Sequence, residues 1–309
     1  MPNFKIEQTN FMLNKVHFNY VLFSFLLVIL ISCNNITYKE KSNKQKAKGT
    51  DTSTVVLKYH NTLFTLPSPY QATHSVKSSD IDFNKRLLNP VNNVSNYATN
   101  FQQALNIGVY GTDLGYLNIY DQIPDVISYF TVIKKLSKEL GLENALQVEI
   151  IDRIENNINN KDSLLQLITG TYRQFDYYLK TNNRKEAGVL ILTGGWIESI
   201  YILSQNAIET NNRQIINRLG EQKHPLDNLI EILSPFYYKS KEYTELIDSL
   251  VDLAYEFDGI IYSYTYLDSN VDKTNKITTI NSKSNVIISE YHLKTISNKI
   301  SSIRNKIIY

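Results

Sequence analysis

A single cysteine in 309 residues is the feature that most limits how this chain can fold. Without a second thiol the chain can form no internal disulfide, even in an oxidising compartment where disulfides persist. The packing of apolar side chains must therefore hold the fold together. The cysteine, Cys33, stands just after a stretch that is apolar from Phe18 to Ile31, and this position indicates a role outside the core.

The apolar stretch before Cys33 is about fourteen residues long, which is typical of a signal-peptide core and shorter than the roughly 20 residues of a membrane-spanning helix. Lys5 and Lys15 supply a basic flank, and translation from Met12 would give a leader of ordinary length. We therefore predict that residues 1–32 are a signal peptide. The alternatives are an uncleaved amphipathic anchor and a start codon assigned too early.

Leu30, Ser32 and Cys33 resemble the lipobox of bacterial lipoproteins. The resemblance implies that Cys33 becomes the acylated first residue after cleavage. One acyl chain binds a membrane only marginally, whereas two or more hold a protein firmly. We therefore expect Cys33 to anchor the protein to a membrane without any transmembrane helix.

Residues 33–53 have the composition of a flexible tether. Asparagine, lysine, serine and threonine dominate this segment, so it cannot contribute a core, and its lysines either lie near anionic lipid or simply solvate the linker. Residues 1–32 carry a net +1 and residues 34–48 a net +4, so the formal charge of +2 leaves −3 for residues 49–309. A body so close to neutral argues against nucleic acid as a partner, which would need clustered Lys and Arg.

Residues 54–309 are predicted to form a single, mainly α domain built as a helical bundle. We expect a short strand at 54–59 and then an extended arm through 66–70, where Pro67 and Pro69 disfavour a helix. Helical periodicity bounded by turn residues predicts helices over residues 91–120, 124–140, 143–157, 162–180, 184–209, 226–233 and 241–257.

The composition changes after Gly259, and we predict a small β element near residues 260–289. Tyrosines alternate with other residues from 262 to 266, and two β-branched runs, 276–280 and 286–288, are joined by polar turn residues as in a hairpin or meander. An amphipathic helix should follow Ser289 as N-cap. Its apolar face is expected to pack on its own domain rather than to join two copies, and consists of Leu293, Ile296, Ile300, Ile303 and Ile307.

Two predicted helices contain an unusual number of glycines. Gly108, Gly111 and Gly115 share one face of a helical wheel, and Gly188 and Gly195 share a face of another. With Gly194, these six glycines cost about 5 kcal/mol of helix propensity relative to alanine. We expect close helix–helix packing to offset that cost; the alternative is a ligand that lies against the bare backbone.

Glu198 is a lone acid in residues 187–203, a stretch apolar on nearly every side of the helix. An ionised carboxylate buried there needs a partner, and we expect a structural salt bridge with Arg173 or Arg184. The alternative is an acid whose pKa is raised by a pocket.

Asp113 lies opposite its glycine stripe, with Tyr116 and Tyr120 three and seven residues further on. We expect its carboxylate to accept hydrogen bonds from these tyrosine hydroxyls. Asp113 and Glu198 are also the candidate catalytic pair, because two carboxyls about 5 to 9 Å apart can support acid/base hydrolysis.

Tyrosine is abundant, with 22 residues, and aromatic faces suit sugars; a compositional bias that also enriches Asn, Ile and Lys is the competing explanation. A local cluster forms the candidate binding site, and consists of Tyr172, Arg173, Asp176 and Tyr177. The sequence contains no phosphate-binding glycine loop, HExxH or GxSxG motif, and its histidines lack paired ligands. We therefore expect no cofactor and no metal.

Several segments together resemble a family of uncharacterised, mostly helical lipoproteins of Bacteroidetes-type bacteria: residues 88–90, 105–114, 194–198 and 304–308. The resemblance implies an envelope location and a helical body, and brings no activity with it. Residues 34–39 lack the acidic residues that surface lipoproteins of such bacteria carry after the cysteine. This departure favours the periplasmic side of the outer membrane over the cell surface.

The leading hypothesis is a noncatalytic, lipid-anchored module that binds or scaffolds an unknown envelope protein or glycan. The alternative is a periplasmic hydrolase that acts on an envelope polymer through Glu198 and Asp113.

Overall fold

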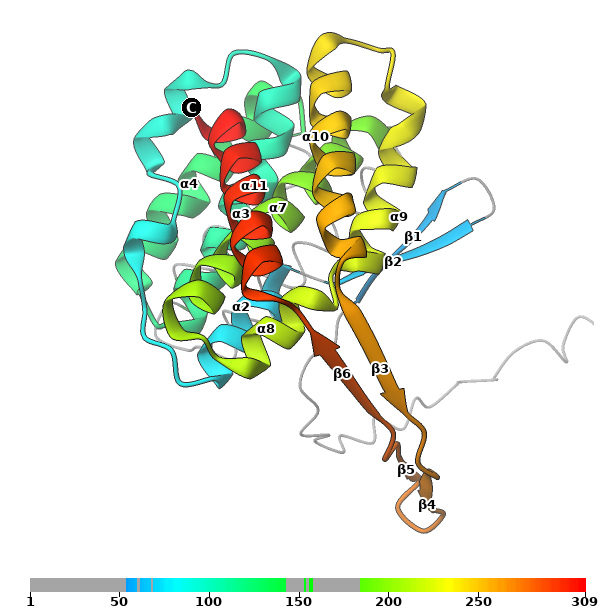
Figure 1. Ribbon diagram of the computed structural model, residues 1–309. Coiled ribbons are helices and arrows are strands. Elements are labelled where there is room, and N and C mark those ends of the chain that lie inside the picture. Colours follow the sequence, from blue (N-terminus) through cyan, green and yellow to red (C-terminus); the bar gives the residue numbers. More distant parts are fainter. Residues whose placement is uncertain (1–53, 60–61, 68, 143–152, 154–155, 158–183) are drawn as a thin grey trace, which may run out of the picture. The chain divides into compact units, whose positions relative to one another are not determined.

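The computed structural model describes residues 54–59, 62–67, 69–142, 153, 156–157 and 184–309 (Figure 1). Asp51–Tyr309 form one compact unit, to which the description below applies. Helices dominate the described residues, with short antiparallel strand pairs near the C-terminus and a final helix, so the predicted mainly α class is confirmed. Cys33, the tyrosine cluster at 172–177 and nearly all of the predicted helices 143–157 and 162–180 lie outside the described residues.

Two long helices, α3 (Asn100–Ile119) and α7 (Lys185–Thr210), pack along each other at the centre of the unit. Thr99 begins α3 with a capping box, because its hydroxyl accepts from Gln102 N while the Gln102 side chain accepts from Thr99 N. Within the described part of the chain, α7 alone is long and apolar enough to cross a membrane; 78% of its most apolar window is buried inside the protein, as in a core helix.

The glycines of α3 and α7 let the two backbones approach closely. A Cβ added to Gly108 would lie 1.9 Å from the Ile191 carbonyl oxygen, and one added to Gly194 would lie 1.9 Å from the Leu105 carbonyl oxygen. Any larger side chain there would force the helices apart, so the expected close packing is confirmed at these two positions. The stripe does not extend as predicted, since a Cβ on Gly115 would meet no atom within 4 Å.

Among the described residues, further helices contact this pair: α2 (Pro69–Ser78), α4 (Ile123–Glu139), α8 (Arg213–Gly220) and α9 (Lys223–Leu233). Helix α10 (Lys241–Asp258) packs on α9. The expectation of an extended arm through 66–70 was wrong at Pro69, which opens α2, because proline is tolerated in the first turn of a helix. The short helix α8 was not predicted. It is separated from α7 by Asn211, whose φ of 50° ends α7, and Asn212, whose side chain caps α8.

Short strands and 3-10 turns lie before and between these helices. Strand β1 (Thr54–Tyr59) confirms the expected strand and pairs antiparallel with β2 (Thr62–Pro67). Two 3-10 turns, η1 (Lys85–Leu87) and η2 (Val91–Asn96), precede α3, so the predicted helix start at residue 91 was wrong. A third, η4 (Ser234–Phe236), follows α9.

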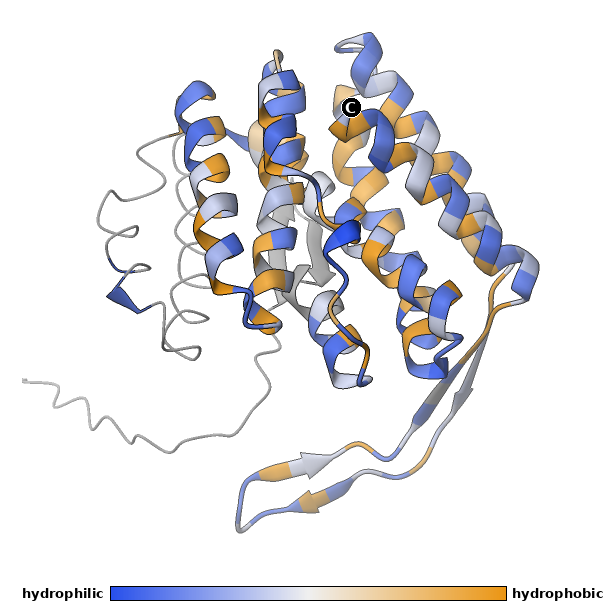
Figure 2. Ribbon diagram, turned by 90° about the vertical axis from the view of Figure 1, so that its left-hand side faces the viewer, coloured by the Kyte–Doolittle hydropathy of each residue, from blue (hydrophilic) through white to orange (hydrophobic). Residues whose placement is uncertain are grey.

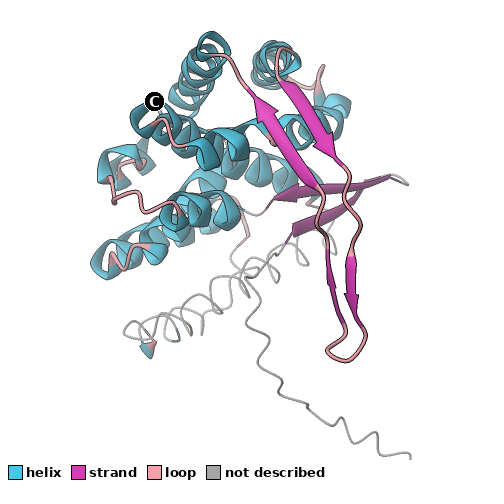
Figure 3. Cartoon of the chain, turned by 60° about the horizontal axis from the view of Figure 1, so that its bottom comes forward, coloured by secondary structure: helices cyan, strands magenta, loops and turns pink. Residues whose placement is uncertain are grey.

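The C-terminal strands form a long two-stranded ribbon that extends beyond the helices (Figures 1 and 3). Strand β3 (Ile261–Thr265) pairs with β6 (Lys283–Ile287), and β4 (Asn270–Asp272) pairs with β5 (Ile277–Thr279). The predicted pairing of 276–280 with 286–288 was wrong. The turn lies instead at 273–276, where the Asp272 carboxylate accepts from Thr274 N and Asn275 N.

The last helix, α11 (Glu290–Ile308), agrees with its prediction. The Ser289 hydroxyl accepts from His292 N, and the five predicted apolar residues are buried. The helix packs against α7 and α10, so its apolar face is used within its own domain.

Candidate functional site

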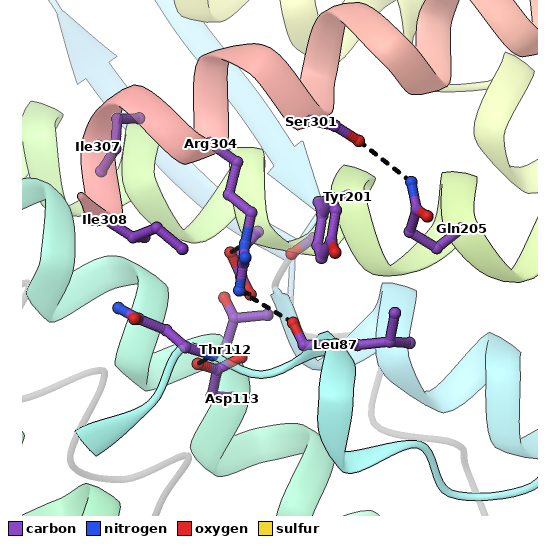
Figure 4. Close-up of polar contacts among 12 residues, drawn as sticks. Leu87, Thr112, Asp113, Tyr201, Gln205, Ser301, Arg304, Ile307 and Ile308 are labelled. Atoms are coloured by element: carbon purple, nitrogen blue, oxygen red, sulfur yellow. Dashed lines mark hydrogen bonds and ion pairs between the residues drawn. The ribbon is translucent and has the colours of Figure 1, made fainter. Parts of the chain in front are cut away.

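The predicted candidate acids Asp113, on α3, and Glu198, on α7, converge on Arg304 of α11 in the middle of the core (Figure 4). Both acids have an exposed fraction of 0%, and Arg304 one of 4%. Three ionisable groups thus meet where no solvent reaches them. Charges in such a place must compensate one another.

Glu198 and Arg304 form a bidentate ion pair. Arg304 Nε donates to Glu198 Oε2 at 2.7 Å, and Arg304 Nη2 donates to Glu198 Oε1 at 2.8 Å. Nη2 also donates to the Leu87 carbonyl at 2.9 Å, and the Tyr201 ring centroid lies 4.2 Å from the guanidinium carbon. Parallel hydrogen bonds and an aromatic face are the surroundings that a buried guanidinium needs.

The expectation of a basic partner for Glu198 is confirmed, but the partner is Arg304 and not Arg184, one of the two residues predicted. Arg184 donates instead to the carbonyls of Leu140 and Gly141, at 3.2 Å each, and Arg173 lies outside the described residues. Arg304 is separated from Glu198 by 106 positions. No local pattern in the sequence reports such a contact.

The buried Asp113 carboxyl lies beside this ion pair. Its Oδ2 accepts from Asn89 N at 3.0 Å, while its Oδ1 accepts no hydrogen bond. Burial and the adjacent Glu198 charge raise the pKa of Asp113 well above its usual value, and the Arg304 charge only partly opposes them. A proton on Oδ1 can then be donated to the Glu198 carboxylate, which satisfies the otherwise unpaired oxygen.

The expected hydrogen bonds from tyrosines to Asp113 do not form. The Tyr116 hydroxyl accepts from Asn84 N at 3.2 Å, and the Tyr120 hydroxyl donates to the Ile81 carbonyl at 2.6 Å. A tyrosine side chain is long, so these hydroxyls reach past the neighbouring helical turn to the segment before η1.

Asn89, Asn106 and Tyr97 extend the cluster to the end of α11, and they were not predicted from the sequence. Asn89 Nδ2 donates to the Tyr97 hydroxyl at 2.9 Å and Asn106 Nδ2 donates to the Ile307 carbonyl at 2.9 Å. The Tyr97 hydroxyl donates to the carbonyl of Ile308 at 3.3 Å. These bonds satisfy carbonyls that the last turn of a helix leaves without partners. The one available signal was Asn106 itself, an amide inside an otherwise apolar stretch.

The buried cluster can hold charge and share a proton, but it offers no route for a substrate. A catalytic acid must come within hydrogen-bond reach of the reacting group, and both carboxyls are closed off by α3, α7 and α11. No group of three or more His, Cys, Asp or Glu residues in the described ranges could hold a metal ion. The geometry is that of a buried structural ion pair that lies among the three helices.

A cavity of about 320 Å³ lies elsewhere, between α2 and α8. The polar groups that line it are engaged with one another: Ser78 Oγ with His74 Nδ1 at 3.2 Å, Ser79 Oγ with Gln214 at 3.3 Å, and Arg218 with Glu221 at 2.9 Å. The cavity contains neither of the predicted acids.

The two-stranded ribbon is a second candidate site, because large apolar side chains remain exposed along both of its strands. Tyr264 is 68% exposed, Tyr266 71% and Ile280 76%. Figure 2 shows apolar residues spread along the ribbon between hydrophilic ones. The full set of exposed large residues is Ile261, Tyr262, Tyr264, Tyr266, Leu267, Val271, Ile277, Ile280 and Ile287.

The base of the ribbon is fixed to the helical body at α8. Val286 is buried, and its Cγ1 occupies the space that a Cβ on Gly220 would need. Tyr262 donates from its hydroxyl to the Gly220 carbonyl at 2.7 Å, and Arg213 donates to the Val286 carbonyl. The ribbon is therefore attached in a defined direction while its outer part stays exposed.

Comparison with protein-family models, curated proteins and solved structures finds no match to this chain. The class of protein is therefore defined by the fold, the buried cluster and the ribbon: it is a helical bundle with a buried carboxylate–guanidinium ion pair and an exposed two-stranded ribbon. The resemblance to Bacteroidetes-type lipoproteins stays a prediction.

Proposed function

We propose that this protein is a lipid-anchored envelope protein that acts as a noncatalytic binding module and presents its β ribbon to a partner. The observation that carries the proposal is the row of exposed apolar side chains on the ribbon. Monomeric proteins seldom leave large contiguous apolar patches in water, and such patches mark interaction sites.

The hydrolase alternative has less support. Glu198 is held by both guanidinium bonds of Arg304, and Asp113 is bound by Asn89 N, so each acid already has a structural task. Exposure of either acid would require α3, α7 and α11 to separate. Such an opening would break the core that defines the fold.

The location rests on the leader and the tether. We propose that acylation of Cys33 anchors the protein in the outer membrane, facing the periplasm rather than the cell surface. A flexible chain of roughly 20 residues, the length of the proposed tether, has a root-mean-square span of about 25 Å. The ribbon could then meet a partner that lies close to the same membrane.

Site-specific photo-cross-linking tests the binding role. A benzophenone amino acid replaces Tyr264 or Tyr266 on the ribbon, and replaces Tyr255 of α10 or Tyr291 of α11 as a control. The controls are matched, since Tyr255 and Tyr291 are each 69% exposed. We expect adducts in intact cells from the ribbon positions alone. Equal yields from ribbon and control positions, or no adducts at all, would count against a binding ribbon.

A further inference from the structure

Resting on this proposed function, we infer that the partner of the ribbon is a second copy of the same chain, bound in an antiparallel arrangement about a two-fold axis near Tyr266. The first argument is that the ribbon is incomplete as a sheet. Its strands pair only in twos within the described chain. An isolated two-stranded ribbon is at best marginally stable in water, and both outer edges keep unpaired backbone groups.

The exposed apolar area suits a dimer interface. The nine large side chains are between 42% and 76% exposed, which amounts, over both faces of the ribbon together, to on the order of 1,000 Å² if each presents roughly 200 Å² when fully exposed. A stable interface buries about 800 Å² of surface on each partner, roughly 60% of it apolar, so one face of the ribbon could supply the apolar part of an interface with a second ribbon.

A protein surface suits the ribbon better than lipid does. The outer part of the ribbon, residues 268–276, contains Asp268, Asp272, Lys273 and Lys276, all exposed. Insertion of this end into a bilayer would bury charges at high cost. The apolar residues are instead spread along the whole length of the ribbon. A partner that covers all of them must present a surface about as long as the ribbon.

The apolar positions of the ribbon are complementary to those of a second ribbon that runs in the opposite direction. The strand path from Ile261 to Asp272 has its midpoint between Tyr266 and Leu267. A two-fold axis there would bring the Ile261–Ile287 pair at the base of one copy to the level of the Asp272–Ile277 pair at the tip of the other. Apolar residues at the two ends of the ribbon would then meet.

The charges fit the same axis. Lys283 pairs across the ribbon with Thr265, just before the midpoint, while Asp268 lies just beyond it. Neither forms an ion pair with another described residue. In the antiparallel arrangement each Lys283 would lie at the level of Asp268 of the second copy. Two-fold symmetry makes this contact twice, as it does in the commonest class of homodimer.

Light scattering on the detergent-extracted full chain tests the stoichiometry. We expect wild type at tens of micromolar to have twice the mass of one chain, and Tyr264→Lys/Tyr266→Lys to be a monomer with at least tenfold weaker association. Tyr255→Lys/Tyr291→Lys is the control with equal exposure and should remain a dimer. A monomeric wild type, or loss of the dimer in the control alone, would overturn the proposal. Circular dichroism of each variant establishes that its helices are intact.

Disulfide trapping in membranes tests the direction. We expect Tyr266→Cys to form a cross-linked dimer on oxidation with copper phenanthroline. Ile261→Cys and Ile277→Cys should each fail alone and form a mixed disulfide when co-expressed. The parent chain, with Cys33 only, and Tyr255→Cys serve as controls. Homodisulfides of Ile261→Cys would contradict the antiparallel arrangement.

The outcomes separate this inference from the proposed function. If wild type is a monomer while photo-cross-linking at Tyr264 joins a different protein, the second copy is excluded and the binding module stands. If neither a dimer nor any ribbon-specific adduct forms, both are overturned.

Discussion

Glu198 and Arg304 join two helices across 106 positions of sequence through two hydrogen bonds of 2.7 and 2.8 Å, in a part of the core that solvent does not reach. Asp113 lies beside them, and burial together with the adjacent Glu198 charge raises the pKa of its carboxyl. Removal of one partner from a buried ion pair leaves an uncompensated charge. The cluster therefore ties α11 to α3 and α7.

Removal of both acids should cost more than the sum of the two single changes. Glu198→Gln alone should cost less than the roughly 3–5 kcal/mol of a broken buried pair, because Asp113 can ionise next to Arg304. Glu198→Gln/Asp113→Asn leaves Arg304 with no carboxylate and should cost the full amount. Urea unfolding of the four proteins in the cycle measures the coupling. Additive free energies would show that Asp113 does not replace Glu198.

Asp113→Asn should change how stability depends on pH. The pKa of Asp113 in the folded protein is raised above the usual value of an aspartate, so the folded protein binds a proton that the unfolded chain releases above about pH 4. Wild-type stability from this group is complete below that pH and falls as pH rises toward the folded pKa, by about 1.4 kcal/mol per pH unit.

Asparagine retains the shape and a donor but cannot ionise. The free energy of unfolding of the Asp113→Asn variant, relative to that of wild type, should therefore increase from pH 4 upward. Urea unfolding of both proteins at pH 4, 5.5 and 7 measures this difference. A difference that stays constant over this range would mean that Asp113 is ionised in the folded protein.

Glycine substitutions should separate contact from open space within a single pair of helices. Gly108→Ala and Gly194→Ala place a Cβ 1.9 Å from a backbone oxygen of the opposite helix, and should destabilise by about 2 kcal/mol or more. Gly115→Ala meets no atom within 4 Å and should stabilise by about 0.5–1 kcal/mol through helix propensity. Thermal unfolding tests this order, and equal melting temperatures would refute it.

Cys33→Ala should release the protein from the membrane without unfolding it, because the composition of residues 33–53 offers almost no apolar side chains for a core. Fractionation after a carbonate wash gives the distribution, and circular dichroism gives the fold. Processing that is insensitive to globomycin, or a variant that remains in the pellet, would count against acylation.

The helical class, most helix positions and the amphipathic face of α11 follow from sequence because they depend on neighbours within a few residues. Ser289, Leu293 and Ile296 show their roles through spacing alone. The short helix α8 spans only Arg213–Gly220, which is too little for its periodicity to stand out from the loops around it. The position of Glu198 in an otherwise apolar helix likewise predicts, from sequence alone, that its charge has a partner.

Only the tertiary structure decides which groups meet. Arg304 becomes the partner of Glu198 because α11 crosses α7 there, and Asp113 faces both because α3 approaches α7 along Gly108 and Gly194. The strand partner of β3 is decided the same way, by Lys283–Ile287 rather than by the nearest β-branched run. Periodicity records the environment of a residue along its own element, whereas a contact between distant elements depends on the packing of the whole core, which no local stretch of sequence contains.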